Sequence, residues 1–189
     1  SFSGNPQDEM IAKGKTLHAV LNGLMTFAEA PLWDSLSVAT ELQYSHLISV
    51  DKNKDLYRGE DFYRGIDKPT DNYYGMNINV TPTYFQVLPG MDMYLPMSLS
   101  QGIGGQSQVV RGGNEGAGSY SVGVAADFYN KYRFDLKYVD NFGDVETCDS
   151  AFDSATPGGT NNYACAKGQI ASSAGPVALL KDRGMVTLT

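Results

Sequence analysis

The chain has 189 residues, of which 11% are aromatic and 19% are charged, and its formal net charge is −7. This length suits a single domain. A net acidic chain lacks the clustered basic face that nucleic-acid binding requires, so we expect no nucleic-acid partner. No apolar run approaches the roughly 20 residues of a membrane-spanning helix.

The first half of the chain alternates apolar and polar residues with a period of two, which predicts β-strands. Residues 16–27 place Leu17 and Leu21 on one face and His18 and Asn22 on the other. Residues 36–45 and 73–87 repeat this alternation. We therefore predict three strands in this half.

The second half continues the pattern. Residues 91–100, 119–128 and 132–139 alternate in the same way, and a further strand begins near Gly184. The sequence thus predicts about seven strands, with apolar residues on one face and polar residues on the other.

The connections between these strands fall into two length classes. Residues 28–35, 88–91 and 129–131 form short turns, whereas long polar loops lie near 51–72, 102–118 and 143–182. Short turns at one end and long loops at the other are typical of outer-membrane barrels, whose long loops face outward.

The turns also predict the strand register, because paired residues must share a face. Pro89 and Gly90 suit the second and third positions of a type II turn. The flanking strands are then expected to pair Leu88 with Met91, Tyr84 with Leu95 and Val80 with Leu99. The next hairpin is expected to pair Phe128 with Tyr132 and Asp127 with Arg133.

Aromatic residues concentrate near both ends of the predicted strands, while aliphatic residues and Met occupy the middles. Two aromatic girdles flanking an apolar band are a feature of membrane barrels. The predicted girdle positions are Phe27, Trp33, Tyr84, Phe128 and Tyr132 near the turns, and Tyr44, Tyr73, Tyr74, Tyr120 and Tyr138 near the long loops.

The polar face carries charged residues that a closed sandwich core would not tolerate, so a soluble protein would have to expose this face to solvent. A water-filled lumen accepts them. The expected lumen-lining residues are Glu41, Asn77, Asn79, Asp92, Asp127, Arg133, Asp135 and Lys137. Charges of opposite sign nearly cancel on the last two strands, which predicts weak ion selectivity.

These patterns predict an all-β fold: an antiparallel, up-and-down transmembrane β-barrel in the bacterial outer membrane, in contact with its lipid. Single-chain bacterial barrels have at least eight strands. We therefore expect residues 1–189 to be the C-terminal segment of one larger barrel domain. The first ten residues lack the features of a signal peptide, so any export signal is expected to lie upstream or to have been removed.

Two cysteines, Cys148 and Cys165, fall in the last long loop. Two cysteines in one exported loop favour a disulfide. Closing that loop would stabilise the fold by about 3 kcal/mol on the chain-entropy estimate. A metal-binding pair and two free thiols are the alternatives.

Two loops resemble ligand-binding motifs without matching them. The loop that begins at Asp51 has acidic residues but lacks the glycine and final glutamate of an EF-hand, which leaves only a looser calcium site as an alternative. The glycine-rich stretch 102–118 has no phosphate-binding signature. It is expected to be a solvated loop or, if folded inward, to narrow a pore with Arg111 and Glu115.

Catalysis has few candidate residues. Only His18 and His46 could act as an imidazole base, and Ser45 and Ser49 are the nearby hydroxyls. A serine hydrolase needs a Ser beside a His with an orienting partner. We predict that the chain is not an enzyme, and we expect no cofactor and no metal.

Three long runs resemble a known family. Residues 77–105, 112–144 and 178–189 are similar to the C-terminal part of the outer-membrane family catalogued as domain of unknown function number 1302, found in Pseudomonas and related Gram-negative bacteria. The resemblance extends over nearly the whole chain. It implies a barrel of several hundred residues that ends in an aromatic residue a few positions after the equivalent of Thr189. That ending is absent from this sequence, which suggests either a truncation or an end that was not observed.

The resemblance also implies a partner. Family members are often encoded beside an exporter of the resistance-nodulation-division type, which implies an envelope export system as partner and hydrophobic compounds as cargo. It transfers no catalytic residue to this chain. We therefore predict a channel for passive or partner-coupled passage of small, hydrophobic molecules. The alternatives are a plugged structural or interaction barrel whose long loops bind a partner, and an outer-membrane hydrolase.

Overall fold

The computed structural model describes residues 12–54, 57, 59, 68–109, 113–147, 170–172, 181 and 183–189. The secondary-structure elements within these residues are β-strands. Their bounds are β1 (Lys13–Phe27), β2 (Ser35–Lys52), β3 (Asn72–Leu88), β4 (Met91–Tyr94), β5 (Met97–Gly104), β6 (Gly118–Phe128), β7 (Tyr132–Phe142), β8 (Val145–Thr147), β9 (Ile170–Ser172) and β10 (Met185–Leu188).

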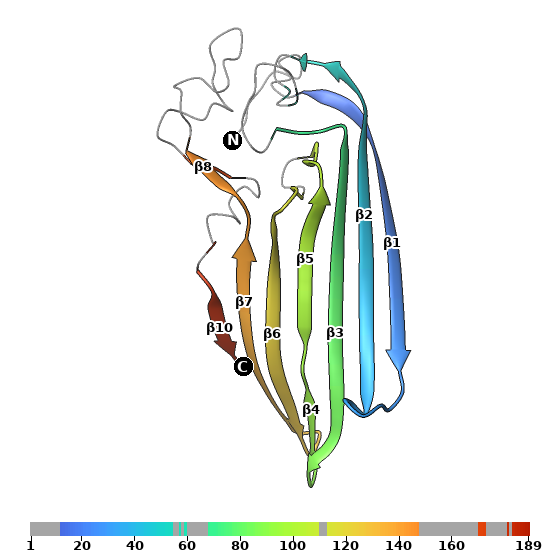
Figure 1. Ribbon diagram of the computed structural model, residues 1–189, viewed down its shortest axis with the longest axis vertical. Helices are drawn as coiled ribbons and strands as arrows, with labels where there is room; N and C mark the ends of the chain where they lie inside the picture. Colours follow the sequence, from blue (N-terminus) through green and yellow to red (C-terminus); the bar gives the residue numbers. More distant parts are fainter. Residues whose placement is uncertain are drawn as a thin grey trace.

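Eight strands form one antiparallel sheet in the order β1-β2-β3-β4-β6-β7-β10, with β5 continuing the position of β4 between β3 and β6. Within this sheet the strands follow one another in chain order, with β4 and β5 sharing one position, so the topology is an up-and-down meander (Figure 1). The all-β, antiparallel prediction is confirmed. β1 and β10 do not pair with each other, and no closed barrel is present in the described part of the chain.

Each strand predicted from the alternation is present. The second strand is longer than predicted, because β2 continues to Lys52. β8 and β9 form a separate two-stranded sheet inside the predicted loop 143–182. Three residues per strand are too few for a period of two to be recognised, so the sequence did not predict this pair.

The fourth predicted strand is divided into β4 and β5. Pro96 lies at the break, where it has no N–H to donate to the ladder. Its carbonyl oxygen accepts a hydrogen bond from the Gly123 N–H (2.9 Å), and the Leu95 N–H donates to the Pro82 carbonyl oxygen (3.0 Å). The neighbouring strands therefore remain connected across the break.

The register of the β6–β7 hairpin is confirmed, with Phe128 opposite Tyr132 and Asp127 opposite Arg133. At the other hairpin, Leu88 pairs with Met91 as predicted. The remaining pairs were predicted wrongly. The observed pairs are Tyr84 with Met93 and Val80 with Met97.

A bulge in β3 between Tyr84 and Leu88 causes the difference. Gln86 has a φ of +51°, and its N–H donates to Asp92 Oδ1 at 2.9 Å. The bulge moves the register by two residues, so each side chain remains on its predicted face. The error in pairing therefore leaves the two predicted faces intact.

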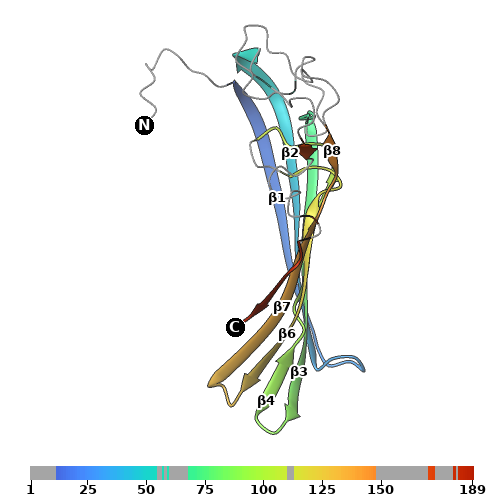
Figure 2. The same cartoon turned by 90° about the vertical axis from the view of Figure 1, so that its left-hand side faces the viewer.

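The sheet is a single twisted layer when it is seen from the side (Figure 2). Among the described residues the buried apolar residues are few: Tyr73, Ala117 and Ala125. β6 shows the arrangement most clearly. Val122 and Val124 are 48% and 45% exposed, whereas Ser121 and Ala125, on the opposite face, are 6% and 0% exposed. Large apolar side chains thus point away from the protein, the reverse of a soluble core.

The three short turns lie together at one end of the sheet (Figure 1). The Phe85 N–H donates to Asp34 Oδ2 at 2.6 Å, which joins the first turn to the end of β3. The Tyr129 N–H donates to the Gly90 carbonyl oxygen at 2.7 Å, which joins the other two turns. These bonds hold the turn end of the sheet together.

Gly90 supplies a test of this turn contact. Its φ is +77°, and an added Cβ would lie 2.4 Å from the Tyr129 ring. We predict that Gly90→Ala lowers the free energy of unfolding of the full-length protein by about 1–2 kcal/mol, because a side chain at positive φ is strained. Urea-induced unfolding measures this change.

The matched control is Gly104→Ala, because an added Cβ there meets only Tyr74, at an ordinary contact distance of 3.8 Å. The control should unfold at the urea concentration of the natural protein. Equal unfolding midpoints for the two variants would contradict the proposed role of the turn contact.

Candidate functional site

The site predicted from the sequence is the face of the sheet that carries the polar residues, here called the polar face. Strand pairing arranges its residues in rows that cross the sheet. One row consists of Asn22, Glu41, Asn77, Ser100 and Ser119, and the next of Leu24, Ala39, Asn79, Ser98 and Ser121. The three predicted residues Glu41, Asn77 and Asn79 are therefore neighbours on adjacent strands.

These rows contain a hollow of about 500 Å³ that spans β1, β2 and β3. Its lining residues are Asn22, Gly23, Leu24, Ala39, Thr40, Glu41, Asn77 and Asn79. The hollow therefore lies where these polar residues gather. Glu41 is the charged residue of this lining, which also offers three side-chain amides and the Thr40 hydroxyl.

Hydrogen bonds within the polar face hold its side chains in place. Gln43 Nε2 donates to Glu41 Oε1 at 2.5 Å, along the same strand. The Ser98 and Ser121 hydroxyls lie 2.6 Å apart on neighbouring strands. Of these residues Glu41 lines the hollow, and its carboxylate is held by the neighbouring Gln43 amide.

A charged cluster lies nearer the turn end of the polar face. Arg133 Nη1 lies 3.2 Å from Asp127 Oδ2, and Arg133 Nη2 lies 3.5 Å from Asp135 Oδ2. The guanidinium carbon is also 5.4 Å from the centre of the Tyr94 ring. The Arg133 side chain is more than half exposed, so each ion pair contributes at most about 1 kcal/mol to stability.

Tyr94 was missing from the predicted site. The signal was available, because Tyr94 has the same parity as Asp92 and therefore lies on the polar face. Asp92 itself accepts the hydrogen bond that closes the β3 bulge, which gives it a structural role beside its place on this face. Lys137 lies further along β7, opposite Gly123 and Thr187.

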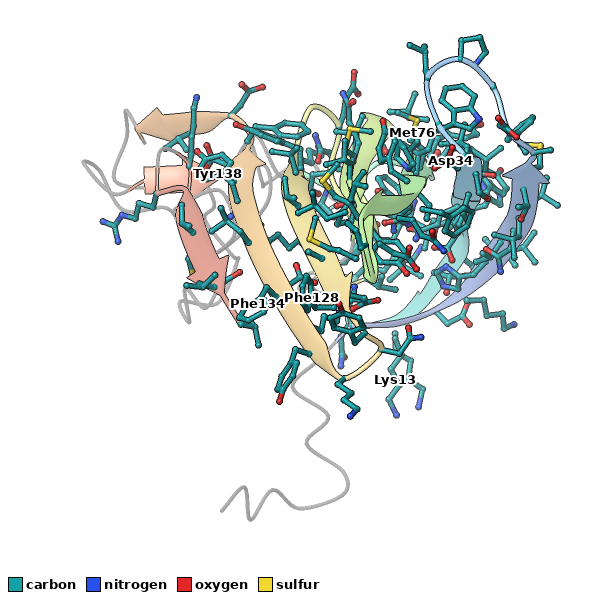
Figure 3. The ribbon with its side chains drawn as sticks, turned by 90° about the horizontal axis from the view of Figure 1, so that it is seen from below. Lys13, Asp34, Met76, Phe128, Phe134 and Tyr138 are labelled. Atoms are coloured by element: carbon teal, nitrogen blue, oxygen red, sulfur yellow. The ribbon has the colours of Figure 1, made fainter. Side chains whose placement is uncertain are left out.

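The opposite face, here called the apolar face, carries most of the predicted girdle. Tyr44 and Tyr74 are paired on β2 and β3, with ring centres 5.1 Å apart. Phe128 on β6 and Phe134 on β7 belong to the two strands that meet at the β6–β7 turn, and both are labelled in the view from the turn end (Figure 3). The other predicted girdle residues are Phe27 at the end of β1, Trp33 in the first turn, Tyr84 on β3, Tyr120 on β6, and Tyr132 and Tyr138 on β7.

One acidic residue lies on this apolar face. Asp140 Oδ2 accepts hydrogen bonds from Tyr138 Oη at 3.0 Å and from Tyr120 Oη at 3.4 Å. The two tyrosine rings are themselves in contact, with centres 6.1 Å apart. Tyr120 and Tyr138 therefore supply hydrogen-bond donors to a carboxylate on the apolar face.

Tyr73 was placed in the girdle by the sequence, and this prediction was wrong. It has the parity of Asn77 and Asn79 on β3, and it is 6% exposed. A Cβ atom added to Gly113 would lie only 1.7 Å from the Tyr73 hydroxyl oxygen, so Gly113 lies directly against this side chain. Nearness to a strand end predicted a girdle position, but parity assigns Tyr73 to the polar face.

The histidines are held by neutral partners. His18 Nδ1 lies 2.7 Å from Ser45 Oγ, a distance suited to a base and its nucleophile. However, His18 Nε2 lies 2.9 Å from Thr16 Oγ1, so a hydroxyl occupies the place of the orienting carboxylate of a serine hydrolase. His46 Nδ1 lies 3.0 Å from Asn72 Oδ1, on the strand opposite.

Several predicted features lie outside the described residues. These are Cys148, Cys165, Arg111 and most of the acidic residues considered for calcium. Within the described part of the chain, no group of three or more His, Cys, Asp or Glu residues could hold a metal ion. The described residues also contain no helix that is long and apolar enough to cross a membrane.

The chain was compared with protein families, with curated proteins and with solved structures. Residues 9–189 match the model of one family, described as protein of unknown function (DUF1302). No curated protein and no solved structure matches the chain. Because the family model covers almost all of the sequence, the chain belongs to the DUF1302 family.

Proposed function

We propose that this chain forms part of the wall of a β-barrel in the bacterial outer membrane, and that the protein is a channel for small molecules. In this proposal the apolar face contacts lipid and the polar face lines the passage. Passage is passive or is coupled to an envelope export system, and its solutes are small and hydrophobic, as the family resemblance implies.

The outward position of the large apolar side chains is the observation that carries this proposal. A single-layer sheet has no second layer to cover such a face. Val122 and Leu136 are each about half exposed, and large exposed apolar surfaces mark contact with a partner or a membrane. Contact with lipid explains this apolar surface better than contact with a protein partner does, because tyrosines and phenylalanines border the aliphatic residues.

The polar face supports the second half of the proposal. Its amides, hydroxyls and half-buried Glu41 would face water in a lumen, where their unused hydrogen-bonding capacity is satisfied. The predicted lumen-lining set contains four acids and two bases, a net charge of −2 (2 minus 4). This small excess predicts a weak preference for cations.

The orientation of the two faces is tested with two variants, each of which adds one positive charge to a different face. In the full-length protein, Val122→Arg should lower the free energy of unfolding from phospholipid vesicles by about 2–4 kcal/mol, because a charge near the bilayer midplane is costly. Asn79→Arg is the matched control, because Asn79 is an exposed residue of the polar face. Urea-induced unfolding monitored by tryptophan fluorescence gives both values.

The control should change the free energy of unfolding by less than about 1 kcal/mol, since its charge would enter water. Equal losses for the two variants would contradict the assignment of faces. Purification of the natural full-length protein from the soluble fraction, without detergent, would contradict the membrane location.

Permeation is tested separately. The full-length protein in a planar bilayer should conduct ions, and Glu41→Gln should lower the ratio of potassium to chloride permeability, because it removes the carboxylate of the hollow. The reversal potential in a salt gradient measures this ratio. Gln43→Glu is the opposite control: it adds a carboxylate beside the same position and should raise the ratio.

An absence of both ion conductance and solute flux would overturn the channel proposal. It would favour a barrel that is closed by its own loops and serves to bind a partner. Conductance without any response to Glu41→Gln would retain the channel and remove the hollow from its passage.

A further inference from the structure

The connection between β5 and β6 turns back over the sheet. Its described parts, residues 105–109 and 113–116, are called the return segment below. Glu115 forms a bridge with Gly102 on β5, and the Gly116 N–H donates to the Gly102 carbonyl oxygen at 3.0 Å. An added Cβ on Gly102 would lie 1.9 Å from the Asn114 carbonyl oxygen. The backbone of the return segment therefore rests directly on Gly102.

The return segment rests on the polar face. Gly102 has the parity of Ser98 and Ser100, which belong to that face, and it pairs with Gly75 on β3. Because neither glycine has a side chain, this pair leaves a flat area on the sheet. A side chain at Gly102 would point from the polar face into the backbone above it, which places the return segment over that face.

Tyr73 provides the second support. Its ring lies between two glycines, since added Cβ atoms on Gly75 and Gly113 would fall 2.4 Å and 1.7 Å from its hydroxyl oxygen. The ring is 6% exposed. The return segment thus packs on a buried aromatic side chain that stands on the polar face.

Hydrogen bonds to the start of β3 provide the third support. The Thr70 N–H donates to the Gln106 carbonyl oxygen at 3.0 Å, and the Gln106 N–H donates to Thr70 Oγ1 at 2.8 Å. Gln108 Nε2 also donates to the Thr70 carbonyl oxygen. Two separate elements, β5 and the residues before β3, therefore hold the return segment from both sides.

We infer that the return segment is a fixed constriction that sets the size limit of the passage. This inference rests on the proposed function, because only a lumen gives the polar face a passage to narrow. The bridge to Gly102, the packing on Tyr73 and the paired bonds to Thr70 oppose movement of the segment. The limit is therefore built into the fold and needs no moving part.

The chemistry of the constriction favours selection by size over selection by charge. Its described side chains are largely amides and hydroxyls, as in Gln106, Ser107 and Asn114. The carboxylate of Glu115 accepts a hydrogen bond from the Gly105 N–H at 3.0 Å. The sequence placed Glu115 at a possible constriction. Its carboxylate forms a hydrogen bond within the return segment and so links the two parts of that segment.

The first test displaces the return segment. In the full-length protein, Gly113→Ala places a methyl group against the Tyr73 ring, which cannot retreat because Gly75 lies close behind it. Liposome-swelling rates are measured with neutral mono-, di- and trisaccharides. The trisaccharide rate relative to the monosaccharide rate should rise roughly twofold or more, and single-channel conductance should rise with it.

Two further variants complete the test. Gly104→Ala is the matched control, because its added Cβ meets only Tyr74 at 3.8 Å, and it should retain the natural size limit. Tyr73→Ala removes the support without adding bulk and should raise the limit as Gly113→Ala does. If Gly113→Ala fails to insert into liposomes, Tyr73→Ala decides the question alone.

The outcomes separate this inference from the proposed function. A conducting natural protein whose size limit is unchanged by Gly113→Ala and Tyr73→Ala would overturn the constriction and keep the channel. A natural protein that conducts only after residues 106–114 are deleted would replace the constriction with a plug. If neither the natural nor the deleted form conducts, the proposed function itself fails.

Discussion

The antiparallel pairing of adjacent strands in the large sheet is the constraint on which the rest of the structure depends. A side chain in such a ladder can face only one of two sides, and a shift of one residue would exchange the sides of a whole strand. In this sheet the pairing places Val122, Leu136 and Leu42 outward, where each is about half exposed. In the described residues no second layer covers these side chains, and this exposed apolar surface is what the membrane proposal explains.

The sequence alone predicted the strand positions and the face on which most side chains lie. Strand positions and faces followed from alternation, and the pairing of Phe128 with Tyr132 followed from a short turn. Tyr84 shows the limit of this approach, because a bulge centred on Gln86 moved its partner from Leu95 to Met93. A bulge that depends on one side-chain contact, here with Asp92, leaves no periodic signal.

The contents of the polar face were predictable only in part. Parity assigned Glu41, Asn77 and Asn79 to it, but their grouping around one hollow depends on the register of three strands. The packing of the return segment was beyond sequence reasoning for a different reason. Gly75, Gly102 and Gly113 matter because side chains are missing there, and a glycine in a strand or loop sequence does not by itself indicate a packing contact. Three-dimensional contacts, above all with Tyr73, show this packing role.

The two ends of the sheet are held together by different contacts, and this bears on how the proposed channel would select its solutes. At the turn end, backbone bonds such as Tyr129 to Gly90 join one hairpin to the next. At the loop end, the bridge between Glu115 and Gly102 joins a loop to the face it covers. A wall fixed at both ends has few ways to adapt to a solute. Selection must then come from fixed dimensions and from hydrogen-bonding groups held in place, which suits passive passage better than a cycle of conformational change.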